Sequence, residues 1–335
     1  MLQCPQQRVR TAAVLGLGYV GLPTAAVFAD AGMQILGVDI NEKAVASIAA
    51  GRPHIVETNL DRLLKKVVDA GTLRATTTPE AADVFVIAVP TPFKDGKKPD
   101  LAFVHSATEM IAPLLEPGNL IILESTCPVG TTEQMSEWLA ERRPDLIFPH
   151  QDPEACNIHL AHCPERILPG KVLHEVVHND RIIGGLTPRC SEAGVGFYKV
   201  AGEGECHVTD ARTAELCKLS ENAYRDVNIA FANEMSLICD RLGVDVWELI
   251  SLTNRHPRVE ILRPGPGVGG HCIAVDPWFI FHSAPEEARL IHAARTINDD
   301  KPDWVVDRVI ELAAEVEKPT HACMGLGFKP GVGDL

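Results

Sequence analysis

Long apolar runs are missing from this sequence. The best of them, such as Val84–Val89, have the length of a buried strand, whereas a helix needs about 18 or more apolar residues to cross a bilayer. The first ten residues are polar, carry two arginines and lack an apolar core, which is unlike a secretory signal. We therefore expect a cytoplasmic protein without a membrane span.

Closely spaced cysteine pairs are missing as well. The ten cysteines are scattered along 335 residues, and none stands in a Cys-x-x-Cys pair. In a chain of this length without a secretory signal, such scattering is typical of reduced thiols in a cytoplasmic protein.

Basic residues are fewer than acidic ones. The sequence has 31 Lys and Arg against 45 Asp and Glu, a net charge of −14. Nucleic acids and anionic membranes are bound by basic patches, so we expect neither as a partner. The 46% of hydrophobic and 23% of charged residues are ordinary globular values and exclude a disordered or fibrous chain. At about 150 residues per domain, the length predicts roughly two domains and a fragment of a third.

Short aliphatic runs alternate with helical stretches over residues 1–208. The runs lack polar alternation, which is typical of strands buried on both faces of a sheet. This series predicts an α/β fold with a doubly wound, Rossmann-type parallel sheet. The expected strands are Ala12–Leu15, Gln34–Val38, Val84–Val89, Leu120–Leu123, Leu146–Phe148 and Arg181–Ile183, and the expected helices include Leu22–Ala31, Glu42–Ala50 and Leu60–Ala70.

The sequence after residue 208 is typical of helices. Thr209–Gly243 contains neither proline nor internal glycine, and its apolar residues recur at helical spacing. A loop rich in glycine and proline follows at Arg263–Gly270. We expect residues 209–300 to form a helical central domain, and residues 301–335 to form a linker helix and the start of a second Rossmann-like domain. The remaining elements are expected at Val246–Leu252, Pro285–Ile297 and Pro302–Val316 (helices) and at His321–Gly327 (strand).

A glycine motif follows the first expected strand. Gly16–Gly21 reads Gly-x-Gly-x-x-Gly, in which the three glycines allow a tight turn, close approach to a pyrophosphate and packing of the next helix. Asp39 ends the following strand and would accept hydrogen bonds from ribose hydroxyls while repelling a 2′-phosphate, so we expect NAD rather than NADP. A structural glycine turn in another α/β fold is the alternative. The residues expected to contact NAD here are Gly16, Gly18, Tyr19, Val20, Gly21 and Asp39.

Polar side chains share one stripe of the long helix. Lys218, Asn222 and Arg225 are spaced i, i+4 and i+7, with Glu215 three residues before them. A lysine, an amide and a guanidinium suit an oriented water or an anionic substrate. A solvated helix face is the alternative.

Cys272 stands at the end of the glycine-rich loop. The four glycines of Gly265–Gly270 let a backbone wrap closely around a ligand, and Asp276 follows four residues after the cysteine. A cysteine in such a place can be a nucleophile if its pKa is lowered. A buried thiol after a flexible turn is the alternative.

Hydroxyl side chains are frequent in Ser125–Thr132, which follows an expected strand and begins a helix. They are available to cap the helix or to bind a ligand. Both interpretations stay open on the residues alone.

In this order, the segments resemble the UDP-glucose/UDP-mannose dehydrogenase superfamily, and the resemblance runs through nearly the whole chain. It rests on Val14–Gly21, Val89–Pro92, Ser125–Thr132, Cys163–Arg166, Lys218–Glu234 and Gly265–Asp276. More narrowly, Cys163–Gly170, Arg255–Val259 and Pro264–Trp278 resemble the branch that oxidises UDP-N-acetyl-D-mannosamine. Members acting on UDP-glucose typically carry lysine where this chain has Val275, which also favours that branch.

The resemblance implies an oxidoreductase that carries out a four-electron oxidation at C6 of the sugar and consumes two NAD. Cys272 would be the nucleophile that holds C6 as a thiohemiacetal and then as a thioester, which keeps the aldehyde from escaping. Lys218 and Asn222 would stabilise the oxyanion.

The remaining catalytic roles are implied in the same way. Glu165 and Asp276 would manage water and protons. Thr126 would orient water or touch the cofactor, and Thr91 would lie against NAD.

The resemblance also implies a UDP-sugar site, in which arginine forks suit the diphosphate. We expect UDP-N-acetyl-D-mannosamine, in surface polysaccharide biosynthesis, from resemblance alone, because residue types do not separate it from the UDP-N-acetylglucosamine or galactosamine epimers. A homodimer formed through the long helix is expected on the same grounds. The residues expected to hold the nucleotide sugar are Arg166, Ile167, Lys218, Asn222, Arg225, His256, Arg258, Gly267 and Lys329.

Two further alternatives stay open. Family members have a third domain that completes the UDP pocket, whereas this sequence stops soon after Lys329. A truncated chain that binds NAD and the nucleotide sugar without turnover would fit that difference. The other alternative is a metal site at ligand-type side chains of short spacing, although Cys163 belongs to the Cys-Pro-Glu-Arg segment of the family and we expect no metal. Those side chains are His150, Cys156, His159, His162 and Cys163.

Overall fold

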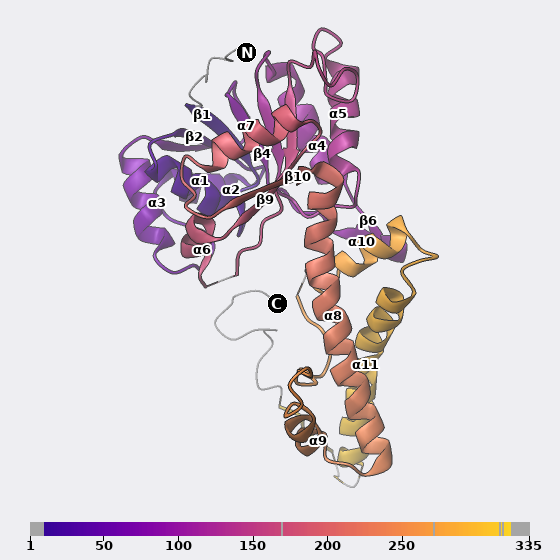
Figure 1. Ribbon diagram of the computed structural model, residues 1–335. Coiled ribbons are helices and arrows are strands. Elements are labelled where there is room, and N and C mark those ends of the chain that lie inside the picture. Colours follow the sequence, from indigo (N-terminus) through magenta and orange to yellow (C-terminus); the bar gives the residue numbers. More distant parts are fainter. Residues whose placement is uncertain (1–9, 169, 271, 315, 317, 323–335) are drawn as a thin grey trace. The chain divides into compact units, whose positions relative to one another are not determined.

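The chain forms two compact units in a computed structural model that describes residues 10–168, 170–270, 272–314, 316 and 318–322 (Figure 1). The first unit contains the residues up to Thr91 and Asp100–Lys218. The second contains Pro92–Pro99 and the residues from Leu219 onward. Residues 92–99 therefore interrupt the first unit in sequence but pack in the second. The predicted division into residues 1–208, 209–300 and 301–335 stays a prediction.

An eight-stranded sheet forms the centre of the first unit (Figure 1). Its order is β10 (Cys206–Asp210), β9 (Arg181–Gly185), β8 (His159–His162), β7 (Leu120–Leu123), β4 (Val84–Ile87), β1 (Thr11–Leu15), β2 (Gln34–Val38) and β3 (Leu73–Thr76). The predicted α/β fold with a doubly wound sheet is confirmed. A wholly parallel sheet is wrong at one place, because β9 pairs with β8 in antiparallel register. Burial on both faces was visible in the sequence, but it does not tell the direction of a strand.

The predicted strand at Leu146–Phe148 is wrong. These residues form an irregular connection, although Leu146 and Phe148 are buried in the core. The strand at this place in the sheet is β8, whose sequence His-Leu-Ala-His places two histidines beside apolar residues. The apolar pattern correctly indicated that these side chains fill the core. It did not indicate that they belong to a loop.

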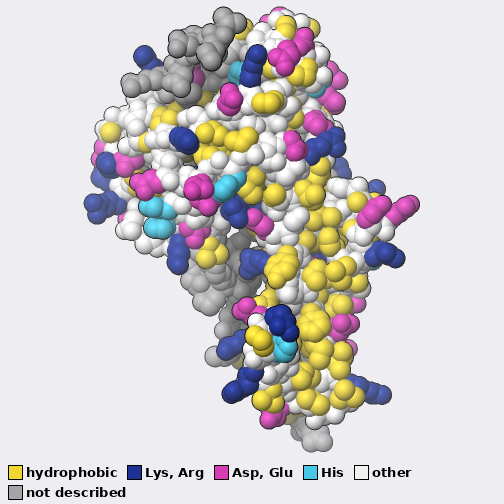
Figure 2. Space-filling view, in the orientation of Figure 1, with side chains coloured by type: hydrophobic (Ala, Val, Ile, Leu, Met, Phe, Trp, Pro, Cys, Tyr) yellow, Lys and Arg dark blue, Asp and Glu magenta, His cyan; other side chains and the backbone are white. Residues whose placement is uncertain are grey.

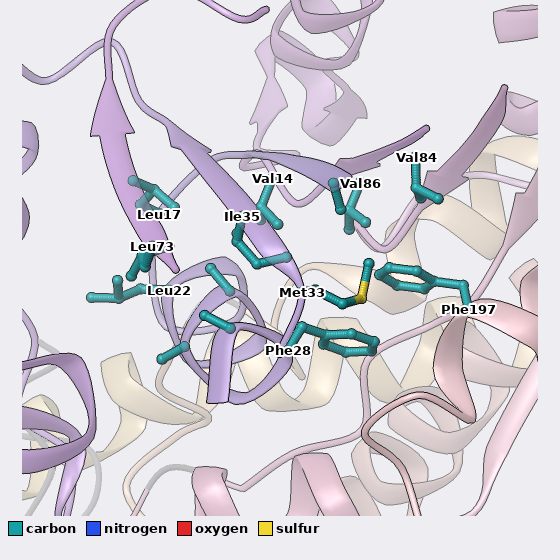
Figure 3. Close-up of a cluster of buried hydrophobic side chains, with 14 of the residues drawn as sticks. Val14, Leu17, Leu22, Phe28, Met33, Ile35, Leu73, Val84, Val86 and Phe197 are labelled. Atoms are coloured by element: carbon teal, nitrogen blue, oxygen red, sulfur yellow. The ribbon is translucent and has the colours of Figure 1, made fainter. Parts of the chain in front are cut away.

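Helices cover both faces of the sheet. Successive residues of β1 and β2 alternate between two hydrophobic clusters, since Val14 and Ile35 belong to one while Ala13 and Leu36 belong to the other. Figure 3 shows the first cluster, in which the Phe28 and Phe197 rings stack with centroids 4.4 Å apart. The helices of this unit are α1 (Gly21–Asp30), α2 (Glu42–Ala49), α3 (Leu60–Asp69), α4 (Ala102–Ile111), α5 (Thr131–Arg142), α6 (Val172–His178) and α7 (Pro188–Tyr198), with a 3₁₀ turn η2 at Ala112–Leu114.

Two long helices, α8 (Ala211–Leu242) and α11 (Arg289–Ala313), organise the second unit. Their hydrogen-bonded partners rise together in number, from Asp226 with Arg295 to Ser236 with Lys301, so the two helices run in the same direction. No helix in the described part of the chain is long and apolar enough to span a bilayer. The smaller elements are α9 (Val246–Thr253), α10 (Asp276–Ser283) and a hairpin of β5 (Phe93–Lys94), η1 (Asp95–Lys97) and β6 (Lys98–Pro99).

The predicted break between two helices at Pro302 is wrong, because α11 continues through this residue. Proline lacks an N–H, so the Asn298 carbonyl loses the helical partner that residue 302 would supply. The proline is tolerated here because α11 contacts α8 both before and after Pro302. The local sequence does not show these contacts. The expected strand His321–Gly327 lies almost wholly outside the described residues.

A buried polar network lies within the first unit. The Tyr198 hydroxyl donates to Glu124 Oε1 at 2.6 Å, and the Arg181 guanidinium stacks over the Tyr198 ring and donates to Glu165 Oε2 at 3.3 Å. Burial, together with the nearby charge of Glu165, raises the pKa of Glu124 to about 7. Neither Glu124, which follows β7, nor Arg181, which begins β9, was predicted to matter, because a charged residue at the end of an apolar strand carries no recognisable pattern.

The raised pKa of Glu124 predicts a pH dependence of stability. The folded protein binds a proton on this carboxyl that the unfolded chain releases near its usual pKa. The free energy of unfolding should therefore fall as the pH rises from about 5 to 7, by up to the order of 3 kcal/mol. Glu124→Gln should flatten this decline in urea titrations followed by circular dichroism. An unchanged slope would contradict the assignment. Glu80→Gln is the control, because the pKa of Glu80 is lowered by its hydrogen bond to Arg74 and that carboxyl titrates below this window.

Candidate functional site

The glycine motif forms a tight turn between β1 and α1, where the strand order reverses beside β4. Gly16 has a left-handed φ of 92°, and a Cβ built on it would lie 2.5 Å from the Ala88 carbonyl oxygen. A Cβ on Gly21 would lie 1.9 Å from the Gly16 carbonyl oxygen. Both positions therefore require glycine for steric reasons.

Gly18 differs from the other two glycines. It is exposed, and a Cβ built on it would meet no heavy atom of the described chain within 4 Å. The N-cap residue of α1, Val20, makes no side-chain capping hydrogen bond. Open space beside an uncapped helix N-terminus fits a pyrophosphate bound by backbone N–H groups.

The Asp39 carboxylate is held at the end of β2. Oδ2 accepts from the Leu17 N–H and Oδ1 from the Asn41 N–H, both at 2.9 Å. Each oxygen keeps a second lone pair, which suits ribose hydroxyls. The chemistry of the motif and of Asp39 thus fits the adenosine half of NAD, and the assignment of these residues to the cofactor stays a prediction.

The loops after β4 and β7 are tied together. Thr91 Oγ1 donates to the Thr126 carbonyl at 2.5 Å, and Ser125 Oγ donates to the Val89 carbonyl at 2.7 Å. Two of the residues predicted to lie near the cofactor are therefore neighbours at the carboxyl edge of the sheet. Ser125 uses its hydroxyl to join the loops.

Glu215 caps α5. Its carboxylate accepts from the Gly130 N–H at 2.6 Å and from the Thr132 N–H and hydroxyl at 2.8 and 2.7 Å. Glu215 is 1% exposed, and burial raises its pKa while these hydrogen bonds lower it. The stripe that began at this residue is therefore not a uniformly solvated face. No local pattern indicates this contact, which joins residues more than 80 positions apart.

Glu165 is buried and engaged on both oxygens. Oε1 accepts from the Arg166 N–H at 2.7 Å, and Oε2 forms the ion pair with Arg181. The Arg166 side chain is exposed and contacts the Asp180 carbonyl at 3.5 Å. It lines a shallow cavity of about 530 Å³ with Ile182, His207 and Thr209 among others. Ile167 is half-buried next to it.

Cys272 lies just before α10 and is exposed. Its carbonyl oxygen accepts from the Val275 and Asp276 N–H groups at 3.1 and 2.9 Å, which ties the end of the glycine loop to the first turn of this helix. The alternative of a buried thiol after a flexible turn is thus excluded for this cysteine. His271, between Gly270 and Cys272, lies outside the described residues.

Asn222 and Asp276 form a buried pair in the second unit. Asn222 Nδ2 donates to Asp276 Oδ2 at 2.5 Å, and the two residues are 6% and 3% exposed. The structure therefore brings together two of the predicted catalytic residues, on α8 and α10. Lys218 is half-buried one turn before Asn222 on the same helix.

The other predicted substrate residues lie on the surface or outside the described chain. Arg225, His256 and Arg258 are exposed, and the Arg258 N–H contacts His256 Nδ1 at 3.4 Å. A Cβ on Gly267 would lie 2.9 Å from Pro302 Cγ, so this glycine packs closely on α11. Lys329 lies outside the described residues.

One group of metal-type side chains comes together among the described residues. The ligand atoms of Cys127, His162 and Glu215 lie within 4.8 Å of one another and are all buried. Burial lowers the pKa of His162 to about 3, so its ring is neutral. The Glu215 carboxylate already caps α5, so a structural role accounts for its position. The cluster proposed from sequence spacing is different, since it shares only His162.

Comparison with known proteins identifies the family. The UDP-glucose/GDP-mannose dehydrogenase family's NAD binding domain matches residues 10–201, and its central domain matches residues 212–300. An NDP-N-acetyl-D-galactosaminuronic acid dehydrogenase of Ralstonia nicotianae is 62% identical over 326 residues, covering 97% of this chain and 77% of the relative. A UDP-N-acetyl-D-mannosamine dehydrogenase of Escherichia coli is 58% identical over 333 residues, covering 97% of this chain and 79% of the relative.

Solved structures agree with this identification. A UDP-D-ManNAc dehydrogenase from Pyrococcus horikoshii superposes with a TM-score of 0.85 at 40% identity, covering 91% of this chain and 72% of the other. A UDP-N-acetyl-mannosamine dehydrogenase from Staphylococcus aureus superposes with a TM-score of 0.83 at 47% identity, covering 92% and 72%. With the glycine motif and Asp39 in place, the chain belongs to the UDP-glucose/GDP-mannose dehydrogenase family, whose members are NAD-dependent oxidoreductases.

Proposed function

We propose that the chain oxidises C6 of UDP-N-acetyl-D-mannosamine to the uronate, with two NAD consumed per sugar. The observation that carries the proposal is the exposed Cys272, tied to α10 beside the buried Asn222–Asp276 pair, in a member of this family. A nucleophilic cysteine needs access to substrate, which a buried thiol lacks.

NAD supplies a hydride acceptor when bound. The chain's part is to hold it, with Gly18 and the N-terminus of α1 at the pyrophosphate and Asp39 at the adenosine ribose. The negative charge of Asp39 disfavours a 2′-phosphate there. Thr91 and Thr126 are assigned to the nicotinamide end because both follow strands at the carboxyl edge of the sheet.

Cys272 is assigned the covalent step. Its thiolate attacks the C6 aldehyde, and the new carbon–sulfur bond gives a thiohemiacetal whose oxidation leaves a thioester. Water then cleaves the carbon–sulfur bond, which releases the carboxylate and returns the thiol. Covalent capture keeps the reactive aldehyde on the protein between the two oxidations.

Polar residues are assigned to charge and protons. The Asn222 amide and the Lys218 ammonium stabilise the developing oxyanion. Asp276 orients Asn222 through their 2.5 Å hydrogen bond, and Glu165 activates water. The remaining residues are assigned to binding of the nucleotide sugar. They are Arg166, Ile167, Arg225, His256, Arg258, Gly267 and Lys329.

The sugar epimer is a separate question. Relatives at 58 to 62% identity carry two different substrate names, one an N-acetylmannosamine and the other an N-acetylgalactosaminuronate. The motif Pro264–Trp278 and the solved structures favour the N-acetylmannosamine branch. An NAD-binding chain without turnover is the second candidate.

A homodimer formed through α8 is part of the proposal. Tyr224, Phe231 and Ile238 recur every seven residues on this helix and are 72%, 51% and 41% exposed. Hydrophobic side chains gather over the region formed by α8, α9 and α11 (Figure 2). An apolar stripe of this kind is typical of a surface covered by another chain.

Replacing Cys272 tests the chemistry. NADH formation at 340 nm should reach two per sugar consumed, with UDP-N-acetyl-D-mannosamine faster than its galactosamine and glucosamine epimers. Cys272→Ser should lower the rate by at least about 10³-fold, because the hydroxyl is a far weaker nucleophile. Cys239→Ser, a buried thiol on α8, is the control and should keep activity. Retained NAD binding without turnover by the unaltered chain would support the second candidate instead.

Replacing Asp39 tests the cofactor site. Asp39→Asn should weaken NAD binding about tenfold in calorimetric titration, because hydrogen bonds to a charged acceptor are lost, and should narrow the preference for NAD over NADP. Asp30→Asn, which breaks a surface ion pair with Lys66, should leave both unchanged. Equal effects of the two changes would argue against a ribose contact.

Sedimentation tests the dimer. The unaltered chain should sediment as a dimer at micromolar concentration, and Phe231→Glu should shift it to the monomer by placing a charge in the apolar stripe. Phe103→Glu, on α4, alters a phenylalanine of similar exposure in the first unit and should leave the dimer intact. A monomeric unaltered chain would contradict the proposal.

A further inference from the structure

A chain of buried hydrogen bonds joins α8 and α11 to the loop that carries Cys272. Asn233 Oδ1 accepts from the Gly265 N–H at 2.9 Å, and Asn233 Nδ2 donates to Asn298 Oδ1 at 2.8 Å. Asn298 Nδ2 then donates to Asp226, at 2.8 Å to Oδ1 and 3.0 Å to the carbonyl. Asn233, Asn298 and Asp226 are at most 1% exposed.

The chemistry at the two ends sets the direction of every bond. The Gly265 N–H can only donate, so Asn233 must turn its oxygen towards it and its amide group towards Asn298. Asp226 at the other end is an acceptor when ionised, so Asn298 must turn its amide group towards Asp226. The amide orientations of both asparagines are therefore determined by their surroundings.

The charged end is itself held in place. The buried Arg295 donates to Asp226 Oδ1 at 2.6 Å and also pairs with Asp299, which pairs with Lys97. Burial raises the pKa of Asp226, and the charge of Arg295 lowers it. The paired cation keeps the carboxylate at the end of the chain as an acceptor.

The contact uses the one backbone N–H available in this stretch. Pro264 and Pro266 flank Gly265, and neither has an N–H, so Gly265 supplies the only backbone donor between Arg263 and Gly267. Gly267 then packs against Pro302 of α11, where a side chain would not fit. The start of the loop is thus fixed to the two long helices.

The end of the loop is fixed separately, through the Cys272 carbonyl at the first turn of α10. We propose that Asn233, Asn298 and Asp226 are positioning residues, which set where the loop begins and thereby hold Cys272 for reaction. The proposal rests on the role of Cys272 in the proposed function. Removing the first anchor leaves a glycine-rich segment free to move at one end, so the thiol spends less time in its reactive position.

Hydrogen exchange at the Gly265 amide tests the anchor without any need for activity. Asn233→Ala should speed its exchange by about tenfold or more, since the acceptor is lost. Because no other amide lies between Arg263 and Gly267, residue-resolved mass spectrometry reads this hydrogen bond alone. Asn298→Ala removes the middle link and should raise exchange by a smaller factor, and it decides the question if Asn233→Ala does not fold.

Ser236→Ala is the matched control. Ser236 accepts from Lys301 at 2.7 Å, one turn further along the same two helices, and donates to the Asn233 carbonyl within α8 at 2.6 Å, so neither bond ends on a loop atom or uses the Asn233 side chain. Its loss should leave exchange at Gly265 unchanged. Wild-type exchange in Asn233→Ala, or an equal rise in Ser236→Ala, would overturn the proposal, because the network would then serve helix packing alone.

Kinetics separate positioning from general destabilisation. With turnover of the unaltered chain established, Asn233→Ala should lower kcat about tenfold or more while the KM for the sugar nucleotide changes little. A changed KM with unchanged kcat would contradict the positioning role. An inactive unaltered chain would count against the proposed function, while the exchange result would still decide the anchor.

Discussion

A polar side chain taken out of water must find partners inside the protein, and this constraint shapes both units. In the first, Glu215 joins the start of α5 to α8, and Arg181 joins Glu165 to Tyr198. In the second, the ion pair of Asp226 and Arg295 joins α8 to α11. The contacts of Glu215 and of Asp226 link elements far apart in sequence, so breaking one leaves a charge without compensation and disturbs two elements at once.

The cofactor site follows from the sheet. Strands that are buried on both faces can contact a ligand only at their ends. The carboxyl ends of β1, β2, β4 and β7 meet where the strand order reverses. The glycine turn is there because β4 lies too close for side chains, as the position of Ala88 beside Gly16 demonstrates. Close packing and pyrophosphate binding therefore both require glycine, at neighbouring positions of the motif.

The cysteine loop is built in another way. Among the described residues no strand pairs with it, and its prolines have no N–H to donate. The Asn233 side chain of α8 holds its start, and backbone hydrogen bonds to the first turn of α10 hold its end. The glycines let the loop backbone follow the shape of a ligand. The two fixed ends keep the geometry that a nucleophile requires.

Local signals in the sequence determined the largely apolar strands β1, β2, β4, β7 and β9, the helices α1, α2, α3, α8 and α9, the dinucleotide motif and, through resemblance, the family. These depend on periodicity, on glycine and on short spacing, which neighbouring residues carry by themselves. Only the tertiary structure decided the antiparallel pairing of β9 with β8, the continuity of α11 through Pro302, and the burial of Glu124 and Glu215. The reason is that strand direction, tolerance of a proline and the partner of a buried charge all depend on residues distant in sequence, which no local pattern contains.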